Sequence, residues 1–240
     1  MNRPLSFSLR NKFSFSFPTI LKLIKDLKVN ILVADANPYS AGLYAGDKSF
    51  IVPLANDPNY LEKLIDLLNK EKVDFYLPGT DVELNICSEN KNLIEKNSNT
   101  IIHISSSNVI NIANDKLKTA LFLKENGFPY LKTILKKDID NKIDDMDFPI
   151  IAKPRHGYRS IGVIKLNNRD ELLNNNIINE NYILQEMAGT DSNEFTCTTI
   201  KVGEKVSKPL MLRRTLRAGD TFQAELESIK PVEGFLTEIT

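Results

Sequence analysis

Apolar and polar positions between residues 19 and 107 fall into blocks that switch between helical and strand-like spacing. Ile31, Leu32 and Val33 form a continuous apolar run, as do Ile101 and Ile102, and such runs are typical of strands covered by helices on both faces. The pattern predicts helices at residues 19–27, 59–70 and 82–95, and strands at residues 30–35, 48–52, 75–78 and 100–104. This alternation indicates a parallel α/β unit.

The first 25 residues have a different character, because they contain basic residues but no acid and are rich in Ser and Phe. Alternating Phe and Ser at residues 13–17 predict a strand ahead of the helix at residues 19–27. A transit peptide has a similar composition and stays open as the alternative.

A second unit is predicted from residue 113 onward, which gives domains of residues 1–112 and 113–240. A helix expected at residues 115–126 ends at Gly127, and Pro129 follows as a typical stop signal. The charged segment at residues 138–147 is expected on the surface.

Composition narrows the class of protein. The 31 basic and 31 acidic residues balance, so no overall field would draw the chain to nucleic acid or to a membrane surface. No apolar run approaches the roughly 20 residues that a membrane-spanning helix needs. Cys87 and Cys197 have no neighbouring Cys or His at metal-binding spacing, which argues against a zinc site or a disulfide framework and favours a cytoplasmic protein.

A dinucleotide-binding oxidoreductase would need a Gly-rich turn after its first strand, where backbone approaches the pyrophosphate. The chain has no glycine before Gly42. Asp35 could hold a ribose hydroxyl in such a fold, but beside Asn37 and Pro38 it is better interpreted as a turn residue. NAD binding is therefore not expected.

Residues 150–164 contain the clearest candidate chemistry. An apolar strand runs into Lys153, and a basic loop follows that contains Arg155, Gly157, Ser160 and Gly162. A flexible lid over phosphates needs the mobility and the hydrogen-bond donors of such a loop, and a triphosphate is the natural ligand. On this segment alone, a β-hairpin with a solvated basic turn is an equally good interpretation.

The next segment favours the nucleotide interpretation. An apolar strand begins at Tyr182 and ends in polar residues, and another strand follows from Glu194. A hinge strand can offer backbone N–H and C=O groups to an adenine edge, and an acid after it can accept hydrogen bonds from ribose hydroxyls. Taken singly, Glu194 is better interpreted as a surface strand residue, and Lys116 as a solvated helix lysine.

Together these motifs resemble the ATP-grasp superfamily and, within it, the carbamoyl-phosphate-synthase large-subunit-like proteins. In that family a lysine near a helix start, a lysine before a Gly-rich lid, and a Gln/Glu-rich hinge followed by an acid surround ATP. The matching residues are Lys116, Lys153, the lid residues Arg155, Gly157, Ser160 and Gly162, the hinge residues Gln185, Glu186, Met187 and Ala188, and Glu194.

The resemblance implies an α/β fold, with a Rossmann-like pre-ATP-grasp domain followed by an incomplete α+β ATP-grasp domain. It also implies roles: Lys116 and Lys153 contact the ATP phosphates, Gln185 or Glu186 faces the adenine amino group, the backbone of Met187 and Ala188 binds the ring, and Glu194 holds the ribose. Arg214, in the basic strand after the hinge, is the candidate catalytic residue, because an Arg fork can neutralise phosphate or an acyl phosphate. A solvated basic hairpin is the alternative there.

Complete members of the family use ATP and Mg²⁺ to activate a carboxylate as an acyl phosphate, which an amine or thiol-type nucleophile then attacks. Nothing after Glu225 matches the family's Glu-x-Asn-like metal-binding pair, so the metal ligands are expected in a missing C-terminal part and turnover is expected to be very low. The expected partners are ATP and an unidentified carboxylate, with a partner chain or a homo-oligomer as a further expectation. The alternative function is a non-catalytic nucleotide-binding or regulatory subunit that needs a second chain.

Overall fold

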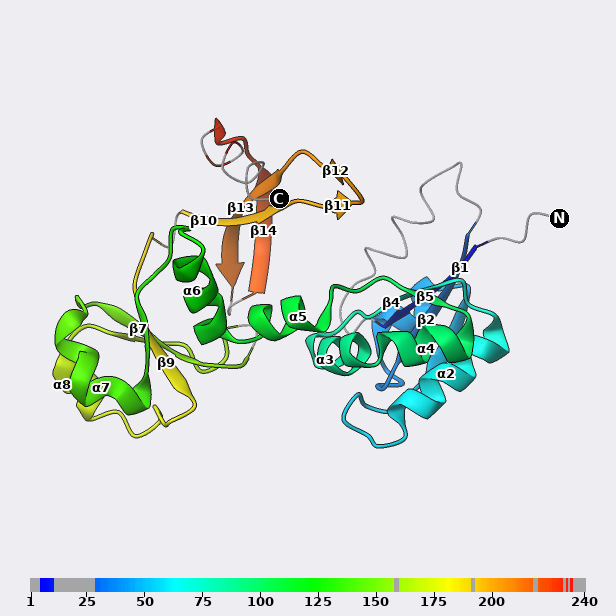
Figure 1. Ribbon diagram of the computed structural model, residues 1–240, viewed down its shortest axis with the longest axis horizontal. Helices are drawn as coiled ribbons and strands as arrows, with labels where there is room; N and C mark the ends of the chain where they lie inside the picture. The colour runs from blue at the N-terminus through cyan, green and yellow to red at the C-terminus, as the bar shows by residue number, and fades with distance from the viewer. Residues whose placement is uncertain are drawn as a thin grey trace. The chain divides into compact units, whose positions relative to one another are not determined.

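The computed structural model describes residues 5–10, 29–157, 160–190, 193–217, 220–230, 232 and 234 of the chain. Two compact units make up the chain, Met1–Ala113 and Asn114–Thr240 (Figure 1). The strand and the helix predicted at residues 13–17 and 19–27 lie outside the described residues. In the described part, no helix combines the length and the apolar character that crossing a bilayer requires.

The described residues of the first unit form a parallel sheet. Its strands are β1 (Leu5–Arg10), β2 (Val29–Asp35), β3 (Lys48–Ile51), β4 (Phe75–Leu77) and β5 (Ile101–Ile102), in the order β3-β2-β1-β4-β5. β1 lies at the centre and pairs with both β2 and β4. This strand was not predicted from the sequence. Its Leu-Ser-Phe-Ser-Leu pattern resembles the Phe/Ser alternation at residues 13–17, where the strand was predicted instead.

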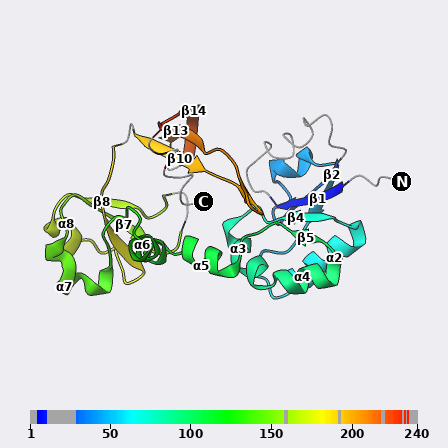
Figure 2. The ribbon, with the colours of Figure 1, turned by 45° about the horizontal axis from the view of Figure 1, so that its top comes forward.

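Both faces of this sheet are covered. Helices α2 (Tyr60–Glu71) and α4 (Lys91–Ser98) pack side by side on one face (Figures 1 and 2), where Leu32 of β2 joins the main core of the unit. Ile31 and Val33, which point to the opposite face, pack with Leu43 of the short helix η1 (Ala41–Ala45). The continuous apolar run of β2 is therefore explained by burial on both sides.

The helix predicted at residues 82–95 is two helices, α3 (Asp81–Glu89) and α4. Asn90 separates them, with φ −106° and ψ 16°, and its side-chain amide donates to the carbonyl of Ile86 at 2.9 Å. An Asn side chain that bonds locally to the backbone competes with helix continuation, which accounts for the break. Helix α5 (Ser107–Ala113) follows β5.

A buried carboxylate lies in the first turn of α3. Glu83 is fully buried, and its Oε1 accepts hydrogen bonds from the hydroxyls of Tyr60 at 2.7 Å and Tyr76 at 2.8 Å. Its Oε2 accepts a third from the Thr80 hydroxyl at 2.6 Å. Burial, and then the charge of Glu83, raises the pKa of Tyr76 well above its ordinary value. These hydroxyl donors replace the water that a buried carboxylate loses.

The second unit begins with α6 (Lys116–Glu125) and an antiparallel sheet in the order β6-β9-β7-β8. The strands are β6 (Thr133–Leu135), β7 (Ile150–Pro154), β8 (Ile164–Leu166) and β9 (Tyr182–Glu186), and α8 (Arg169–Leu173) follows β8. Ile150, Ala152 and Leu184 are fully buried in its core. The central pair β7 and β9 therefore gives the unit a rigid base for the polar residues at the strand ends.

The segment predicted to lie on the surface, residues 138–147, is partly core. It forms η2 (Lys136–Asp138), α7 (Ile139–Lys142) and η3 (Ile143–Asp145). Ile139, Ile143 and Met146 are only 6%, 3% and 5% exposed, and they pack beneath the antiparallel sheet. The surface expectation was wrong for these apolar residues, while Lys142, Asp144 and Asp145 between them are exposed.

A second antiparallel sheet follows in the same unit, formed by β10 (Glu194–Thr198), β13 (Leu210–Arg217) and β14 (Asp220–Leu226) (Figure 2). A small hairpin of β11 (Lys201–Val202) and β12 (Lys205–Val206) connects β10 to β13. Gly203 makes its turn with φ +59°, a value that glycine adopts readily.

Candidate functional site

Lys116 is the first residue of α6, and it reaches the loop that follows β7. Its Nζ donates to the carbonyl of Gly157 at 3.0 Å, and its backbone N–H donates to the carbonyl of Arg155 at 3.2 Å. Asp115 caps the helix by accepting from the N–H groups of Leu117 and Lys118. The helix start is thus the element that fixes the direction of the Lys116 side chain.

Lys153 emerges near the end of β7, where the sequence pattern placed it. Its Nζ donates to Oε1 of Gln185 at 2.7 Å, and Gln185 lies on the neighbouring strand β9. The amide of Gln185 donates in turn to the Thr133 hydroxyl on β6 at 2.8 Å. A polar chain therefore crosses three strands of the sheet, and the contribution of Thr133 was not foreseen from the sequence.

The two lysines influence one another. Burial lowers the pKa of the Lys153 ammonium, and the positive charge of Lys116 lowers it further. Burial also lowers the pKa of Lys116, against the opposing effect of the Asp115 charge. Two partly desolvated cations held close together favour an anion between them, because an anion would relieve both the burial penalty and the repulsion.

Arg155 does not point toward this pair of cations. Its Nε and Nη2 donate to the carboxylate of Asp115 at 2.7–3.0 Å. Burial alone would raise the pKa of Asp115, but the hydrogen bonds from Arg155 and from the Lys118 backbone outweigh it and hold that pKa below its ordinary value. His156 approaches the same carboxylate at 3.6 Å with a largely exposed ring.

The described residues of the glycine-containing loop include three with positive φ. Ser160 and Gly162 both have positive φ, +53° and +76°, and Gly157 has φ +153°. A Cβ at Gly162 would stand 2.9 Å from both Pro154 Cγ and the Tyr182 hydroxyl, so only glycine fits there. Residues 158 and 159 of the predicted lid lie outside the described part of the chain.

The hinge residues follow β9. The carboxylate of Glu186 accepts from the N–H of Lys132 at 2.9 Å, and the Glu186 N–H donates to the Lys132 carbonyl at 3.0 Å. Met187 is half-buried and Ala188 is exposed beyond the strand end. Glu186 therefore joins β9 to the start of β6, an engagement that the sequence did not indicate.

Glu194 and Arg214 lie in the second antiparallel sheet, directly opposite each other on β10 and β13. They form an ion pair, and Arg214 Nη1 also donates to the Thr221 hydroxyl at 3.1 Å. Within the described residues, the buried Nε of Arg214 has no partner. The predicted site residues therefore fall into two groups. Lys153 contacts Gln185, and Lys116 contacts the loop that follows Lys153. Glu194 and Arg214 pair with each other in the second antiparallel sheet.

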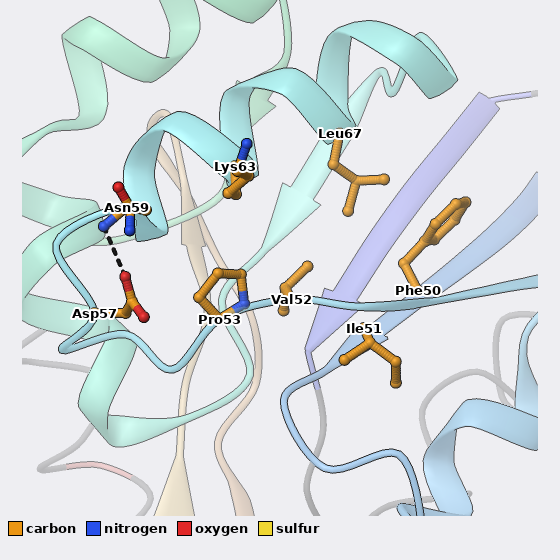
Figure 3. A pocket seen from close by; sticks show the side chains of 8 residues that line it. All are labelled: Phe50, Ile51, Val52, Pro53, Asp57, Asn59, Lys63 and Leu67. Carbon is orange, nitrogen blue, oxygen red and sulfur yellow. Dashed lines mark hydrogen bonds between the residues drawn. The ribbon is translucent and has the colours of Figure 1, made fainter.

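A pocket of about 560 Å³ lies in the first unit, between β3 and α2 (Figure 3). Its wall is mostly apolar, with Asp57 and Lys63 as the charged residues, and it contains none of the predicted site residues. Among the described residues, no group of three or more His, Cys, Asp or Glu side chains is arranged to hold a metal ion.

Comparisons with known proteins bear on the fold. Residues 5–102 match the family model described as PylC-like, N-terminal domain. A search among curated proteins found no match.

Several solved structures are similar over most or all of the chain. N5-carboxyaminoimidazole synthetase from Staphylococcus aureus complexed with ADP has a TM-score of 0.75 at 16% identity, covering 100% of this chain and 62% of that one. L-amino acid ligase from Bacillus licheniformis has a TM-score of 0.66 at 15% identity, covering 99% and 59%. The biotin carboxylase domain dimer of Hydrogenobacter thermophilus 2-oxoglutarate carboxylase, a complex with MgADP, ADP and bicarbonate, has a TM-score of 0.57 at 18% identity, covering 78% and 45%.

The chain therefore has the fold of ATP-grasp enzymes: a Rossmann-like N-terminal domain, followed by part of an ATP-grasp domain. This confirms the predicted fold class. The chain spans about six-tenths of the length of the first solved structures that it matches.

Proposed function

We propose that the second unit binds ATP, with Lys116 and Lys153 on its phosphates. One observation supports this most strongly: Lys116 of α6 donates to the carbonyls of Arg155 and Gly157, in the loop that directly follows Lys153 of β7, so two partly buried ammonium groups lie beside the same loop. The lowered pKa of Lys153 agrees with this arrangement, because the charge of Lys116 contributes to it after burial. Their positive charges and the donor-rich loop beside them match the chemistry of a phosphate chain.

The remaining residues take the roles that the resemblance implies. Gly157, Ser160 and Gly162 form the lid, Gln185 or Glu186 faces the adenine amino group, and the backbone of Met187 and Ala188 binds the ring. Glu194 holds the ribose through the oxygen that its ion pair with Arg214 leaves available, and Arg214 neutralises charge during transfer. The exposed backbone after β9 and the location of Glu194 on the following strand are compatible with these roles.

The reaction proposed is that of a carboxylate ligase. A carboxylate oxygen attacks the γ-phosphorus of ATP, ADP departs, and an amine or thiol-type nucleophile then displaces phosphate from the acyl phosphate. In this scheme the two lysines hold the phosphate oxygens and offset their charge as transfer proceeds. The described residues contain no cluster that fits Mg²⁺, so no step through the metal is assigned to them.

Finer assignments stay predictions. These are the relation to carbamoyl-phosphate synthase, the identity of the carboxylate, the cytoplasmic location, and the need for a partner chain or a homo-oligomer. Very low turnover is expected of this chain in either case, so ATP binding without turnover does not separate the ligase from the alternative, a non-catalytic nucleotide-binding subunit. A coding segment with a Glu-x-Asn-like pair, in frame with or adjacent to the Thr240 codon, would favour the ligase.

Isothermal titration of ATP and ADP tests the proposal. Lys153→Gln should weaken ATP affinity about 10- to 150-fold, because a hydrogen bond to a charged group contributes roughly 1.5–3 kcal/mol. Lys165→Gln is the matched control, since Lys165 is an exposed lysine of β8 in the same sheet and should leave the affinity unchanged. Absence of ATP binding in a folded wild-type sample would overturn the proposed function.

A further inference from the structure

The lid loop is fastened to the first turn of α6 by one buried side chain. Asp115 is 2% exposed, yet its carboxylate receives Nε and Nη2 of Arg155 as well as the N–H groups of Leu117 and Lys118. One carboxylate thus joins the start of a helix to the base of a loop 40 residues away in sequence.

Backbone contacts reinforce the same connection. The N–H of Lys116 donates to the Arg155 carbonyl at 3.2 Å, and the N–H of Arg155 donates to the Asn181 carbonyl at 2.8 Å. Lys116 Nζ reaches the carbonyl of Gly157 at 3.0 Å. Arg155 is therefore fixed by its bonds to the start of α6, by its bond to Asn181 just before β9, and by its covalent link to the end of β7.

The far end of the loop is also fixed. Gly162 packs so closely against Pro154 and Tyr182 that a Cβ would approach both within 2.9 Å, and the Val163 N–H donates to the Ser160 carbonyl at 3.2 Å. Arg155 and Gly162, the described residues at the two ends of the loop, are therefore both held by contacts with the rest of the second unit.

We propose that Asp115 and Arg155 are a positioning pair that sets the place of the Lys116 ammonium and of the lid base, and that Arg155 is not itself a phosphate ligand. The inference rests on the proposed ATP site and deepens it. Arg155 has a second effect: by pairing with Asp115, it offsets a negative charge that would otherwise oppose phosphate binding next to Lys116.

The two possible roles of Arg155 predict opposite results for Asp115→Asn. If Arg155 bound phosphate directly, removing the Asp115 charge would free the guanidinium and remove a nearby anion, so ATP would bind at least as tightly. If the pair acts by positioning, the same substitution loosens Lys116 and the lid base, and ATP binds more weakly. Asn caps helices about as well as Asp, so α6 should keep its cap.

The experiment is a double-mutant cycle with Asp115→Asn, Arg155→Gln and the double variant, titrated with ATP and AMP by calorimetry. Each single variant should lose about tenfold in ATP affinity, and the double variant should lose no more than either single one, because residues that act as a unit are not additive. AMP affinity should change much less, since AMP lacks the phosphates that Lys116 would hold. The control is the exposed Arg169–Asp144 ion pair, whose variants Arg169→Gln and Asp144→Asn should leave ATP affinity unchanged.

A second measurement needs no nucleotide. Hydrogen exchange at the amides of Lys116 and Arg155 should accelerate in both single variants, while exchange at β8 stays unchanged. Unchanged ATP affinity or a gain in Asp115→Asn, additive losses in the double variant, or unchanged exchange at both amides would each overturn the positioning role. A folded wild-type chain that binds no ATP, but whose variants show accelerated exchange, would overturn the proposed function and leave the coupling between α6 and the loop supported.

Discussion

Replacing Glu83 with leucine would remove the acceptor that three hydroxyl groups share inside the first unit. Tyr60 and Tyr76 both donate to one oxygen, and Thr80 donates to the other. The hydroxyls of Tyr60 and Tyr76 lie 3.1 Å apart and would stay hydrogen-bonded to each other. Only one of the two can donate in that bond, so the O–H of the other needs a different acceptor. The Tyr60 hydroxyl also lies 3.8 Å from the Cys87 sulfur, which is only a weak acceptor. The substitution therefore leaves at least one buried donor with, at best, a weak acceptor in place of a carboxylate.

The expected cost follows from what remains buried. An unsatisfied buried donor costs about 1–3 kcal/mol, and breaking a buried charged network by removing one partner costs about 3–5 kcal/mol in total. We expect Glu83→Leu to lower the free energy of unfolding by about 3–5 kcal/mol. Glu83→Gln keeps the volume and one acceptor oxygen, so it should cost about 1–2 kcal/mol. A typical domain is stable by roughly 5–15 kcal/mol, so the leucine variant should be visibly destabilised.

Urea unfolding followed by far-ultraviolet circular dichroism measures this difference, because the chain has no tryptophan for a fluorescence signal. Glu89→Gln is the matched control, since Glu89 is an exposed acid at the end of the same helix and should change stability by less than about 0.5 kcal/mol. If Glu83→Leu were as mild as Glu89→Gln, the buried hydroxyl network would not stabilise the unit and the reasoning would be refuted.

Two further predictions concern the second unit. Gly162→Ala should lower the melting temperature clearly more than Gly203→Ala. Both glycines have positive φ, but only at Gly162 would the added Cβ lie within 3 Å of other atoms. Equal shifts in melting temperature would contradict this steric argument. Lys116→Met should raise the pKa of Lys153, because it removes the positive charge that lowers that pKa, and an NMR titration of the Lys153 side chain measures the change. An unchanged or lower Lys153 pKa in that variant would mean that the two ammonium groups do not interact.

The sequence predicted most of the first unit because its signals are local. The helix predicted at residues 59–70 is α2 to within a residue at each end, and its buried face includes Leu64 and Leu68, which lie four residues apart. Two of the misses have clear physical causes. β1 is the central strand because it pairs with both β2 and β4, and a local sequence pattern cannot predict pairing with strands so far away along the chain. The break at Asn90 depends on a side-chain hydrogen bond to Ile86 that competes with helix continuation.

The candidate site was predicted unevenly. Lys153 lies near the end of β7. In the register of β7 and β9, Gln185 pairs with Ile151, and Ile151 and Lys153 point to the same side of the sheet because side chains alternate along a strand. The proximity of Lys153 to Gln185 therefore follows once this register is known. Arg155 was expected among the residues of a lid over the phosphates, because it is basic and lies in the loop. Its engagement by Asp115 depends on tertiary packing between α6 and β7, although the capping preference of Asp at a helix start was a readable signal. The buried spacing of Ile139, Ile143 and Met146 was also readable, but the surrounding charges obscured it.

Because β1 is the central strand, the sheet cannot be completed until strands on both sides of β1 have been synthesised. Leu5–Arg10 is synthesised before the other described strands of this sheet, and Phe7 pairs in register with Phe75 of β4. One edge of β1 is therefore covered only after β4 has been synthesised. Deleting the first ten residues would separate β2–β3 from β4–β5 rather than trim an edge. Affinity tags fused close to Leu5 should therefore be placed behind a spacer.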